Sequence, residues 1–431
     1  MAKKRGLTMR LLGCAMAAAI LWFNFTPQVQ SLRLLPEQIN MVAGGVLEWN
    51  LFFPVRVDID TPVVGAAGSR DERLADVGAT PISSRVSLSA DTVGDTRYTV
   101  KLFGVIPVKS VTVKVAPERL LIPGGQAVGI ALHTEGVLVV GIAEVGTRSP
   151  ARDAGIQAGD WILEAGGIKV ENSGHLTQLL EKAGVAGSRL RIRRGQATLE
   201  VAVLPARDGP GGTFRIGAWV RDSTAGVGTL SFIDKAAARF GALGHAVTDG
   251  DTHQQLSVSS GSVFLSQIVS INKGKRGQPG ELRGIFPESK TAVGSIDTNT
   301  DYGLYGAYTG SIEPYAPYSG GLPIGTRAGI VEGPATILTT IDERGVREYA
   351  CSIVHLSPQT APATRSLVLE ITDAELLAAT GGIVQGMSGS PIIQNGHIIG
   401  AVTHVYVNDP TRGYGLYIEW MLENGIDKFT T

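Results

Sequence analysis

The chain has 431 residues, which is too long for one ordinary hydrophobic core and indicates two or three compact domains. Lys and Arg number 38 against 39 Asp and Glu, so the net charge is −1 and the chain lacks the basic field that nucleic-acid-binding proteins use. Two cysteines, Cys14 and Cys351, exclude a disulfide framework and a multi-cysteine metal site. The 56 glycines, without any collagen period, favour short strands joined by tight turns and predict a mainly β, multi-domain fold.

The amino-terminal segment has the charge order of an exported protein. Four cations precede an apolar run from Leu11 to Phe25; they are Lys3, Lys4, Arg5 and Arg10. This order is typical of a secretory signal or a membrane anchor. No small-x-small cleavage pattern follows the run, so we expect residues 1–30 to form an anchor with its positive end inside, with a cleaved signal as the alternative.

A small β-domain is predicted for residues 35–117. Short apolar runs alternate there with turn residues, at Val46 to Val57, Tyr98 to Phe103 and Val111 to Val115. Because this stretch holds no catalytic constellation, we expect it to act as a spacer or an interaction module.

Residues 120–206 resemble a PDZ domain. The glycine turn Gly124-Gly125 and an apolar strand from Gly136 to Ile142 precede the segments Ser149 to Ile156 and Ala158 to Leu163, which match the PDZ order "SPA…AGI.AGD.I". In PDZ domains a loop of backbone N–H groups binds a peptide's terminal carboxylate while the peptide adds a strand to the sheet. The resemblance implies that this loop is formed by Ala127, Val128, Gly129 and Ile130.

The glycine-rich stretch Arg207 to Gly212 reads as a linker, and residues 212–431 form the last predicted unit. Its short apolar strands with glycine at the turns suit a two-barrel or sandwich β architecture. Within it, Gly386-Met387-Ser388-Gly389-Ser390-Pro391 resembles the Gly-Asp-Ser-Gly-Gly-Pro turn of chymotrypsin-like serine proteases. Such a turn exposes a serine hydroxyl and aims the N–H groups of Gly386 and Ser388 at one point, where an oxyanion would sit.

A serine nucleophile needs a base and an acid that orients the base. His245 is our candidate for the base, because small residues and glycines surround it, whereas two other histidines lie in the PDZ-like block, three lie in strands, and His253 is expected to be solvated. Asp373 is our candidate for the acid. It lies only 15 residues before Ser388, closer than in chymotrypsin-like enzymes. The alternatives for the acid therefore stay open; they are Asp249, Asp251, Asp297 and Asp301.

Nearly the whole chain is similar to the stage IV sporulation protein B family, the signalling serine peptidases of endospore-forming bacteria. The similarity extends from Leu102-Phe103-Gly104-Val105-Ile106-Pro107 through the segments around His245 and Ser388 to Gly400 to Val405. It implies a PDZ domain followed by a chymotrypsin-like double β-barrel, self-cleavage, and cleavage of a membrane-anchored regulator that releases an intramembrane protease and so activates the late mother-cell sigma factor. It also implies the triad His245, Asp373 and Ser388 and a location between the inner and outer forespore membranes.

Neither a metal nor an organic cofactor is expected, since a serine peptidase needs none. Two other hypotheses remain at this stage. The first is a non-catalytic scaffold whose PDZ-like block binds peptide termini. The second is a general exported quality-control protease with a PDZ sensor, which would differ from the signalling peptidase in its range of substrates.

Overall fold

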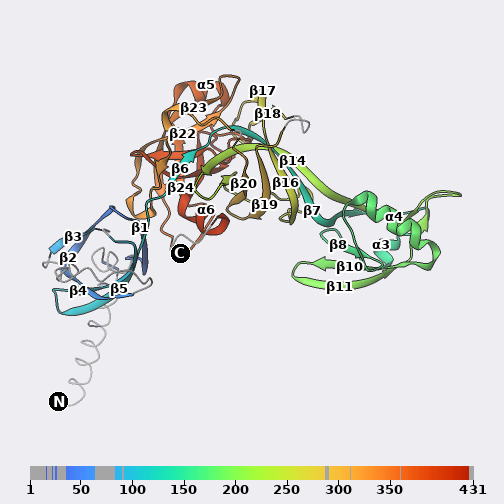
Figure 1. The fold of residues 1–431 in the computed structure, drawn as a ribbon, viewed down its shortest axis with the longest axis horizontal. Coiled ribbons are helices and arrows are strands. Elements are labelled where there is room, and N and C mark those ends of the chain that lie inside the picture. The colour runs from blue at the N-terminus through green and yellow to red at the C-terminus, as the bar shows by residue number, and fades with distance from the viewer. Residues whose placement is uncertain are drawn as a thin grey trace, which may run out of the picture.

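The structure is a computed structural model that describes residues 35–63, 83–89, 92–286, 291–310, 312–359 and 361–426, together with positions 16, 22, 25 and 26 (Figure 1). The predicted anchor of residues 1–30 therefore lies outside the described residues, except for those positions. Within the described part, no helix is both long and apolar enough to cross a membrane. Figure 1 shows three parts in a row, with a small sheet at one end, two barrels in the middle and the PDZ-like block at the other end.

The amino-terminal part is a five-stranded sheet with strand order β1-β5-β4-β2-β3. Its strands are β1 (Gln38–Val42), β2 (Val46–Val63), β3 (Ser83–Ser89), β4 (Gly94–Leu102) and β5 (Ile106–Ala116). Alternate apolar residues of β2, β4 and β5 point to one side, as the period of two predicts, and form a core with Val55, Val100 and Val113 inside it.

The first barrel is a ring of six strands in the order β7, β16, β19, β20, β15 and β14, which the pairing of β14 with β7 closes. The strands are β7 (Ala127–Ile142), β16 (Val258–Leu265), β19 (Gly294–Thr300), β20 (Gly303–Tyr308), β15 (Arg239–Ala242) and β14 (Ala218–Asp234). Two short strands extend its sheet, β6 (Leu120–Pro123) and β21 (Leu322–Pro323), and a separate hairpin is formed by β17 (Gln267–Asn272) and β18 (Glu281–Ile285).

The second barrel is closed by six strands in the order β22-β23-β24-β27-β26-β25. They are β22 (Gly333–Thr340), β23 (Val346–Leu356), β24 (Leu367–Ile371), β27 (Arg412–Tyr417), β26 (His397–Val405) and β25 (Pro391–Gln394). Helix α5 (Ala374–Thr380) follows β24, and α6 (Ile418–Gly425) follows β27. Short 3-10 turns lie at Ala316–Tyr318 and Arg327–Gly329.

The PDZ-like block is inserted between the two longest strands of the first barrel. It contains helices α3 (Pro150–Asp153) and α4 (Ser173–Ala183), the turn Gly184–Ala186, and strands β8 (Trp161–Ala165), β9 (Ile168–Lys169), β10 (Ser188–Arg194), β11 (Ala197–Val203), β12 (Ala206–Arg207) and β13 (Phe214–Arg215). The far half of β7 pairs with β8, and the first residues of β14 pair with the end of β7.

This insertion differs from the linear order that the sequence predicts. Residues 127–134, which the sequence assigns to the PDZ domain, pair with β16 and with the second half of β14 in the first barrel. Residues 218–221, which it assigns to the last unit, pair with residues 138–142 of the PDZ-like block. Each of the two long strands therefore belongs to both parts, because a strand of 16 or 17 residues is long enough to cross two cores.

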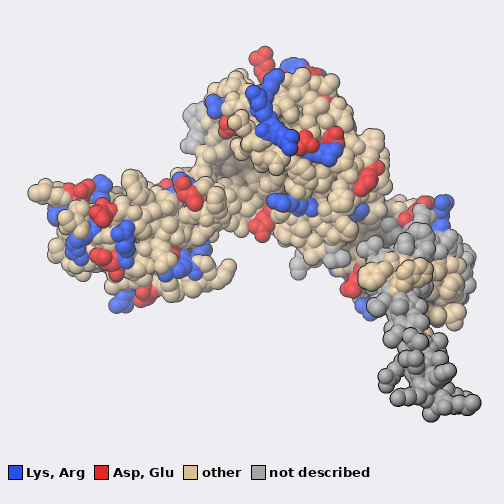
Figure 2. Space-filling model, turned by 180° about the vertical axis from the view of Figure 1, so that it is seen from behind, with Lys and Arg blue, Asp and Glu red and all other residues tan. Residues whose placement is uncertain are grey.

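Charged groups of both signs lie on the face of the molecule that Figure 2 displays. Figure 2 shows acidic and basic groups interspersed among uncharged residues on the face that it displays, which agrees with the net charge of −1. A field of one sign that would steer a large polyanion is not seen on this face.

Candidate active site and peptide groove

Ser388 lies on a tight turn between helix α5 and strand β25, at the junction of the two barrels. Gly386 and Gly389 in this turn have φ angles of +96° and +101°, which side chains rarely adopt. A Cβ at Gly389 would also lie 2.0 Å from the carbonyl oxygen of Thr229 on β14. The glycines that the sequence singled out are therefore required, because the backbone of the first barrel lies directly against the serine turn.

The turn presents two free backbone donors. Within the described residues, the N–H groups of Gly386 and Ser388 donate to no other group. Their carbonyl groups are held instead: the Thr229 hydroxyl donates to the Gly386 oxygen at 2.7 Å, and the Thr229 N–H donates to the Ser388 oxygen at 2.9 Å. Such fixed, unpaired donors suit an oxyanion. Sequence reasoning missed the buried Thr229, since one threonine in an apolar strand gives no local signal.

His245 follows a sharp bend after β15, where Leu243 and Gly244 have φ angles of +69° and +70°. Its ring nitrogen Nδ1 lies 2.8 Å from the carbonyl oxygen of Ala246. Because a carbonyl only accepts, Nδ1 carries the hydrogen and Nε2 keeps its lone pair. Burial lowers the pKa of His245 from its ordinary value of 6.5, so the imidazole is neutral near pH 7. A neutral imidazole with a free Nε2 is the form that a general base needs.

Strand β26 brings the serine and the histidine to the same place. The Ser388 hydroxyl donates to the Thr403 carbonyl oxygen at 2.7 Å, and the ring of the next residue, His404, lies 5.1 Å from the His245 ring. Burial lowers the pKa of His404 to about 4, and the nearby His245 and Arg365 lower it further because a second cation beside them is disfavoured. The segments that carry the serine and the histidine are therefore adjacent, and no hydrogen bond joins Ser388 to His245 among the described residues.

The depressed pKa of His245 predicts the acid side of the pH profile. Since the neutral imidazole accepts the serine proton, we expect kcat/KM to stay level near pH 7 and to fall only below pH 6.5, as the ring becomes protonated. The measurement is kcat/KM on a peptide substrate at a series of pH values. A midpoint above pH 6.5 would contradict this environment for His245.

Asp373, the predicted acid, caps helix α5 in this structure. One carboxylate oxygen accepts the Leu376 N–H at 2.9 Å, and the other accepts the Ala350 N–H at 3.4 Å. No hydrogen bond or ion pair joins Asp373 to His245 among the interactions of the described residues. His245 and Ser388 thus both lie against strand β26, whereas the position of Asp373 is set by the helix that begins after it.

The other candidate acids separate into paired and unpaired groups. Asp249 and Asp251 both bind Arg221, and Asp297 binds Arg239 through two oxygens. These three carboxylates are therefore engaged away from His245. Asp301 makes no hydrogen bond or ion pair with another described residue.

Asp301 lies in the turn between β19 and β20, beside the strand that leads to His245. Strand β15 pairs antiparallel with β20, with Ala242 opposite Leu304. Continued by three residues, this register sets His245 opposite Asp301, although the chain bends after Ala242. The two segments are close, because a Cβ at Gly303 would lie 2.7 Å from the Ala242 oxygen.

The predicted carboxylate-binding loop is not a loop. Ala127, Val128, Gly129 and Ile130 form the start of β7, which is paired on one edge with β14 and on the other with β16. A strand with both edges paired cannot accept a peptide strand. The prediction for these four residues is therefore corrected: they belong to the wall of the first barrel.

A groove with the features of a peptide site lies instead between α4 and the start of β14. A cavity of about 280 Å³ is lined there by Leu176 and Leu180 of the helix and by Ile216 to Val220. Gly217 has a φ of +71°, and the N–H groups of Ile216 and Gly217 donate to no group in the described part of the chain. No strand of that part pairs with the outer edge of residues 218–221. An open edge beside free N–H groups suits an added peptide strand.

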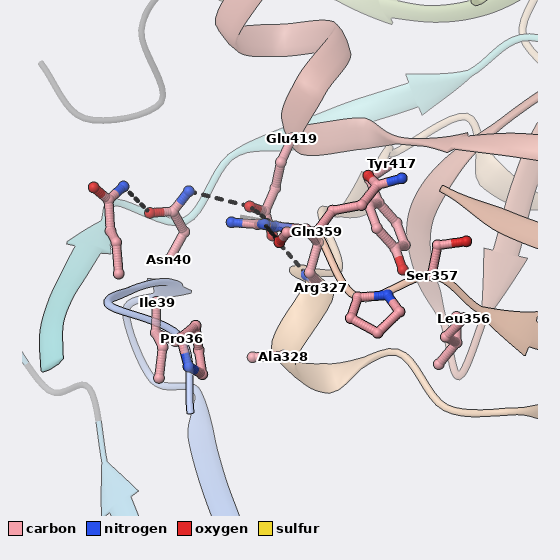
Figure 3. A pocket seen from close by; sticks show the side chains of 12 residues that line it. Pro36, Ile39, Asn40, Arg327, Ala328, Leu356, Ser357, Gln359, Tyr417 and Glu419 are labelled. Atoms are coloured by element: carbon pink, nitrogen blue, oxygen red, sulfur yellow. Dashed lines mark hydrogen bonds and ion pairs between the residues drawn. The ribbon is translucent and has the colours of Figure 1, made fainter. Parts of the chain in front are cut away.

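A second cavity, of about 320 Å³, lies where the small sheet meets the second barrel (Figure 3). Its wall holds the fully buried Glu419, which accepts the Arg327 N–H at 2.6 Å, Arg327 Nε at 3.0 Å and Asn40 Nδ2 at 3.1 Å. Burial raises the pKa of Glu419, and the Arg327 cation opposes that rise. Asn40 belongs to β1, so this network fastens the small sheet to the barrel.

Removing one partner of this network is expected to destabilise the second barrel. An Arg327→Met variant should lose about 3–5 kcal/mol, because it leaves the Glu419 carboxylate buried without its cation. The double variant Arg327→Met/Glu419→Leu should recover most of that loss. Urea unfolding followed by circular dichroism measures this for the single and the double variant. Equal destabilisation of the single and double variants would contradict the pairing.

Comparison with known proteins locates two families in the chain. A family model described as SpoIVB peptidase S55 matches residues 212–422, and a PDZ domain model matches residues 141–194. The PDZ domain of the SdrC-like protein Lmo2051 of Listeria monocytogenes is 22% identical over 20% of this chain and 87% of that chain, with a TM-score of 0.18. The active form of the Mycobacterium tuberculosis protease Rv3671c is 15% identical over 48% of this chain and 80% of that chain, with a TM-score of 0.26. The inactive form of the same protease is 15% identical over 46% of this chain and 82% of that chain, with a TM-score of 0.25.

Proposed function

The chain belongs to the SpoIVB peptidase S55 family of serine peptidases and carries a PDZ domain, and from this premise we propose that Ser388 is its nucleophile and His245 its general base. The observation that carries the assignment is the serine turn itself. Two unbonded N–H groups, from Gly386 and Ser388, flank the serine hydroxyl, and that hydroxyl bonds the residue before His404, whose ring contacts the neutral His245 imidazole.

The reaction then follows from these groups. The Ser388 hydroxyl leaves the Thr403 carbonyl, gives its proton to His245 Nε2 and attacks the scissile carbonyl carbon. The two free N–H groups bind the oxyanion of the tetrahedral intermediate. The imidazolium returns the proton to the leaving amine, and water hydrolyses the acyl-enzyme by the same proton path. Thr229 acts on this step as a positioning residue, since it fixes the carbonyl groups of the turn.

We propose Asp301 as the carboxylate that orients His245 during catalysis. It is the candidate acid without a partner among the described residues, and the continued β15–β20 register sets it opposite His245. For this interaction, the His245 Nδ1–H group would exchange its present acceptor, the Ala246 oxygen, for the Asp301 carboxylate. Hydrogen bonds of a catalytic group often tighten only when substrate is bound.

A matched pair of variants distinguishes Asp301 from Asp373. Asp301→Asn should lower kcat by about a thousandfold or more and move the acid limb of the pH profile to lower pH, because the charge that stabilises the imidazolium is lost. Asp373→Asn should change kcat by less than about twofold, since asparagine caps a helix as well as aspartate. Steady-state kinetics on one peptide substrate measures both. The reverse pattern would show that Asp373 reaches His245 in the working enzyme.

For the biological role, we propose a signalling peptidase of sporulation that is exported to the space between the two forespore membranes. There it cleaves itself and a membrane-anchored regulator of an intramembrane protease. Family membership and the cationic, then apolar, amino-terminal segment support this role. The peptide groove between α4 and β14 would bind the terminus or an extended strand of a partner.

The test compares substrates at equal concentration. The full chain in vesicles should cleave a co-reconstituted, membrane-anchored regulator at one or a few bonds, and should leave unfolded casein nearly intact. The Ser388→Ala variant is the control for contaminating proteases. Faster digestion of casein at many bonds would contradict a signalling role and would favour a quality-control protease.

A further inference from the structure

The hairpin between β4 and β5 ends in a cluster of exposed apolar side chains. Phe103 is 50% exposed, Val105 76%, Ile106 56% and Val108 40%, and Pro107 is also exposed. We call these five residues the apolar hairpin tip. Single exposed apolar residues are ordinary, but a contiguous group on a soluble surface marks a place of contact.

The turn at this tip places phenylalanine where folding alone would not favour it. The Val105 N–H donates to the Leu102 oxygen at 3.1 Å, and Phe103 and Gly104 between them have φ angles of +51° and +77°. This is the type I′ geometry that favours Asn-Gly. A bulky side chain in the left-handed region is strained, and half of the Phe103 surface still faces water. The Phe103 ring makes an edge contact with Phe53, with ring centres 6.2 Å apart.

Cations flank the tip on both strands. Lys101 precedes it on β4 and Lys109 follows it on β5. Lys101 and Arg56 share the single carboxylate of Asp58, at 2.7 and 2.8 Å, whereas Lys109 forms no ion pair with a described residue. An apolar tip between lysines matches the composition of segments that lie in the headgroup region of an anionic bilayer.

The position of the tip in the chain also favours a bilayer. Only 12 residues separate Phe25, the end of the cationic and apolar amino-terminal segment, from Gln38 at the start of β1. Fully extended, they span at most about 40 Å. If that segment is held in a membrane, the small sheet stays within reach of the bilayer surface.

We infer that the apolar hairpin tip inserts into the headgroup region of an anionic lipid bilayer. It thereby gives the small sheet a second attachment beside the amino-terminal segment. The inference rests on the proposed membrane attachment for its argument of proximity, but not on the peptidase mechanism. The occupant is the lipid itself: Phe103, Val105 and Ile106 enter the bilayer, and Lys101 and Lys109 face lipid phosphates.

An environment-sensitive label tests this in the full chain. With Cys14 replaced by serine, Val105→Cys is labelled with the fluorophore NBD. Cys351 does not react, because burial raises the pKa of its thiol to about 12. The matched control is Val93→Cys, a valine that is 59% exposed just before the other end of β4. Both proteins are reconstituted in vesicles of phosphatidylcholine and phosphatidylglycerol in equal parts, with and without bromine on the acyl chains.

The tip label should shift its emission to the blue and lose intensity in brominated vesicles, while the control label should do neither. Because both proteins keep the amino-terminal segment, attachment through that segment alone leaves both labels in water, and this result would overturn the inference. A blue shift without quenching by bromine would overturn it as well, since it would place the tip against protein. The proteolytic activity of the two labelled chains is measured separately and does not enter this comparison.

Discussion

Ser388→Ala is expected to abolish cleavage of a protein substrate and any self-cleavage, with a fall in kcat of about a millionfold. Serine peptidases lose this much when the nucleophile is removed, because only binding and oxyanion stabilisation remain. The fold should be unchanged, since among the described residues the hydroxyl bonds only the Thr403 carbonyl. Purified protein, assayed on a peptide substrate and by unfolding, gives both values.

The same turn supplies a matched control. Ser390, two residues on, is fully buried, and its hydroxyl has no hydrogen-bond partner among the described residues. Ser390→Ala should therefore keep activity and stability close to those of the unmodified chain. Equal losses in the Ser388 and Ser390 variants would mean that the turn needs serine for its shape and that Ser388 is not the nucleophile.

His245→Gln is expected to reduce kcat about as far as Ser388→Ala does. Without an imidazole, the serine keeps its proton and is a weak nucleophile. The double variant should be no slower than either single variant, because residues of one catalytic unit show strongly non-additive effects. Kinetics of the two single variants and the double variant measures this coupling.

His397→Gln is the control for this prediction. Its Nδ1 also lies close to a backbone carbonyl, 2.9 Å from the Asn395 oxygen, but the side chain is exposed on the strand β26 hairpin. The His397→Gln variant should leave kcat unchanged. If His245→Gln and Ser388→Ala instead multiplied their effects in the double variant, His245 would act independently of the serine.

The mainly β fold, with a PDZ domain and a peptidase part of two barrels, could be predicted from the sequence and is confirmed, whereas the insertion of the PDZ domain between β7 and β14 could not be predicted. The domain boundary that lies within β7 could not be predicted either. Residues 127–130 have a short apolar sequence that suits a barrel strand as well as a PDZ loop. Only their pairing with β14 and β16, more than 90 residues later in the chain, assigns them to a barrel. Local pattern carries no information about such distant partners.

The serine turn and His245 could be recognised because glycines stand beside both, at positions where a Cβ would meet a neighbouring segment closely. At Asp373, by contrast, the local sequence allows two interpretations. An aspartate directly before Ala374 to Thr380 is also an N-cap signal, and the structure uses it as a cap. Asp301 and Thr229 have no local signal of function, because each depends on which strand lies beside it.

The most direct test of the central claim, that Ser388 is an activated nucleophile, is labelling with a fluorophosphonate followed by mass spectrometry of the digested protein. The unmodified full chain should carry one adduct, on the Ser388 hydroxyl, and His245→Gln should greatly slow its formation. No adduct on the folded chain, or an adduct on another serine with Ser388 unmodified, would contradict the assignment.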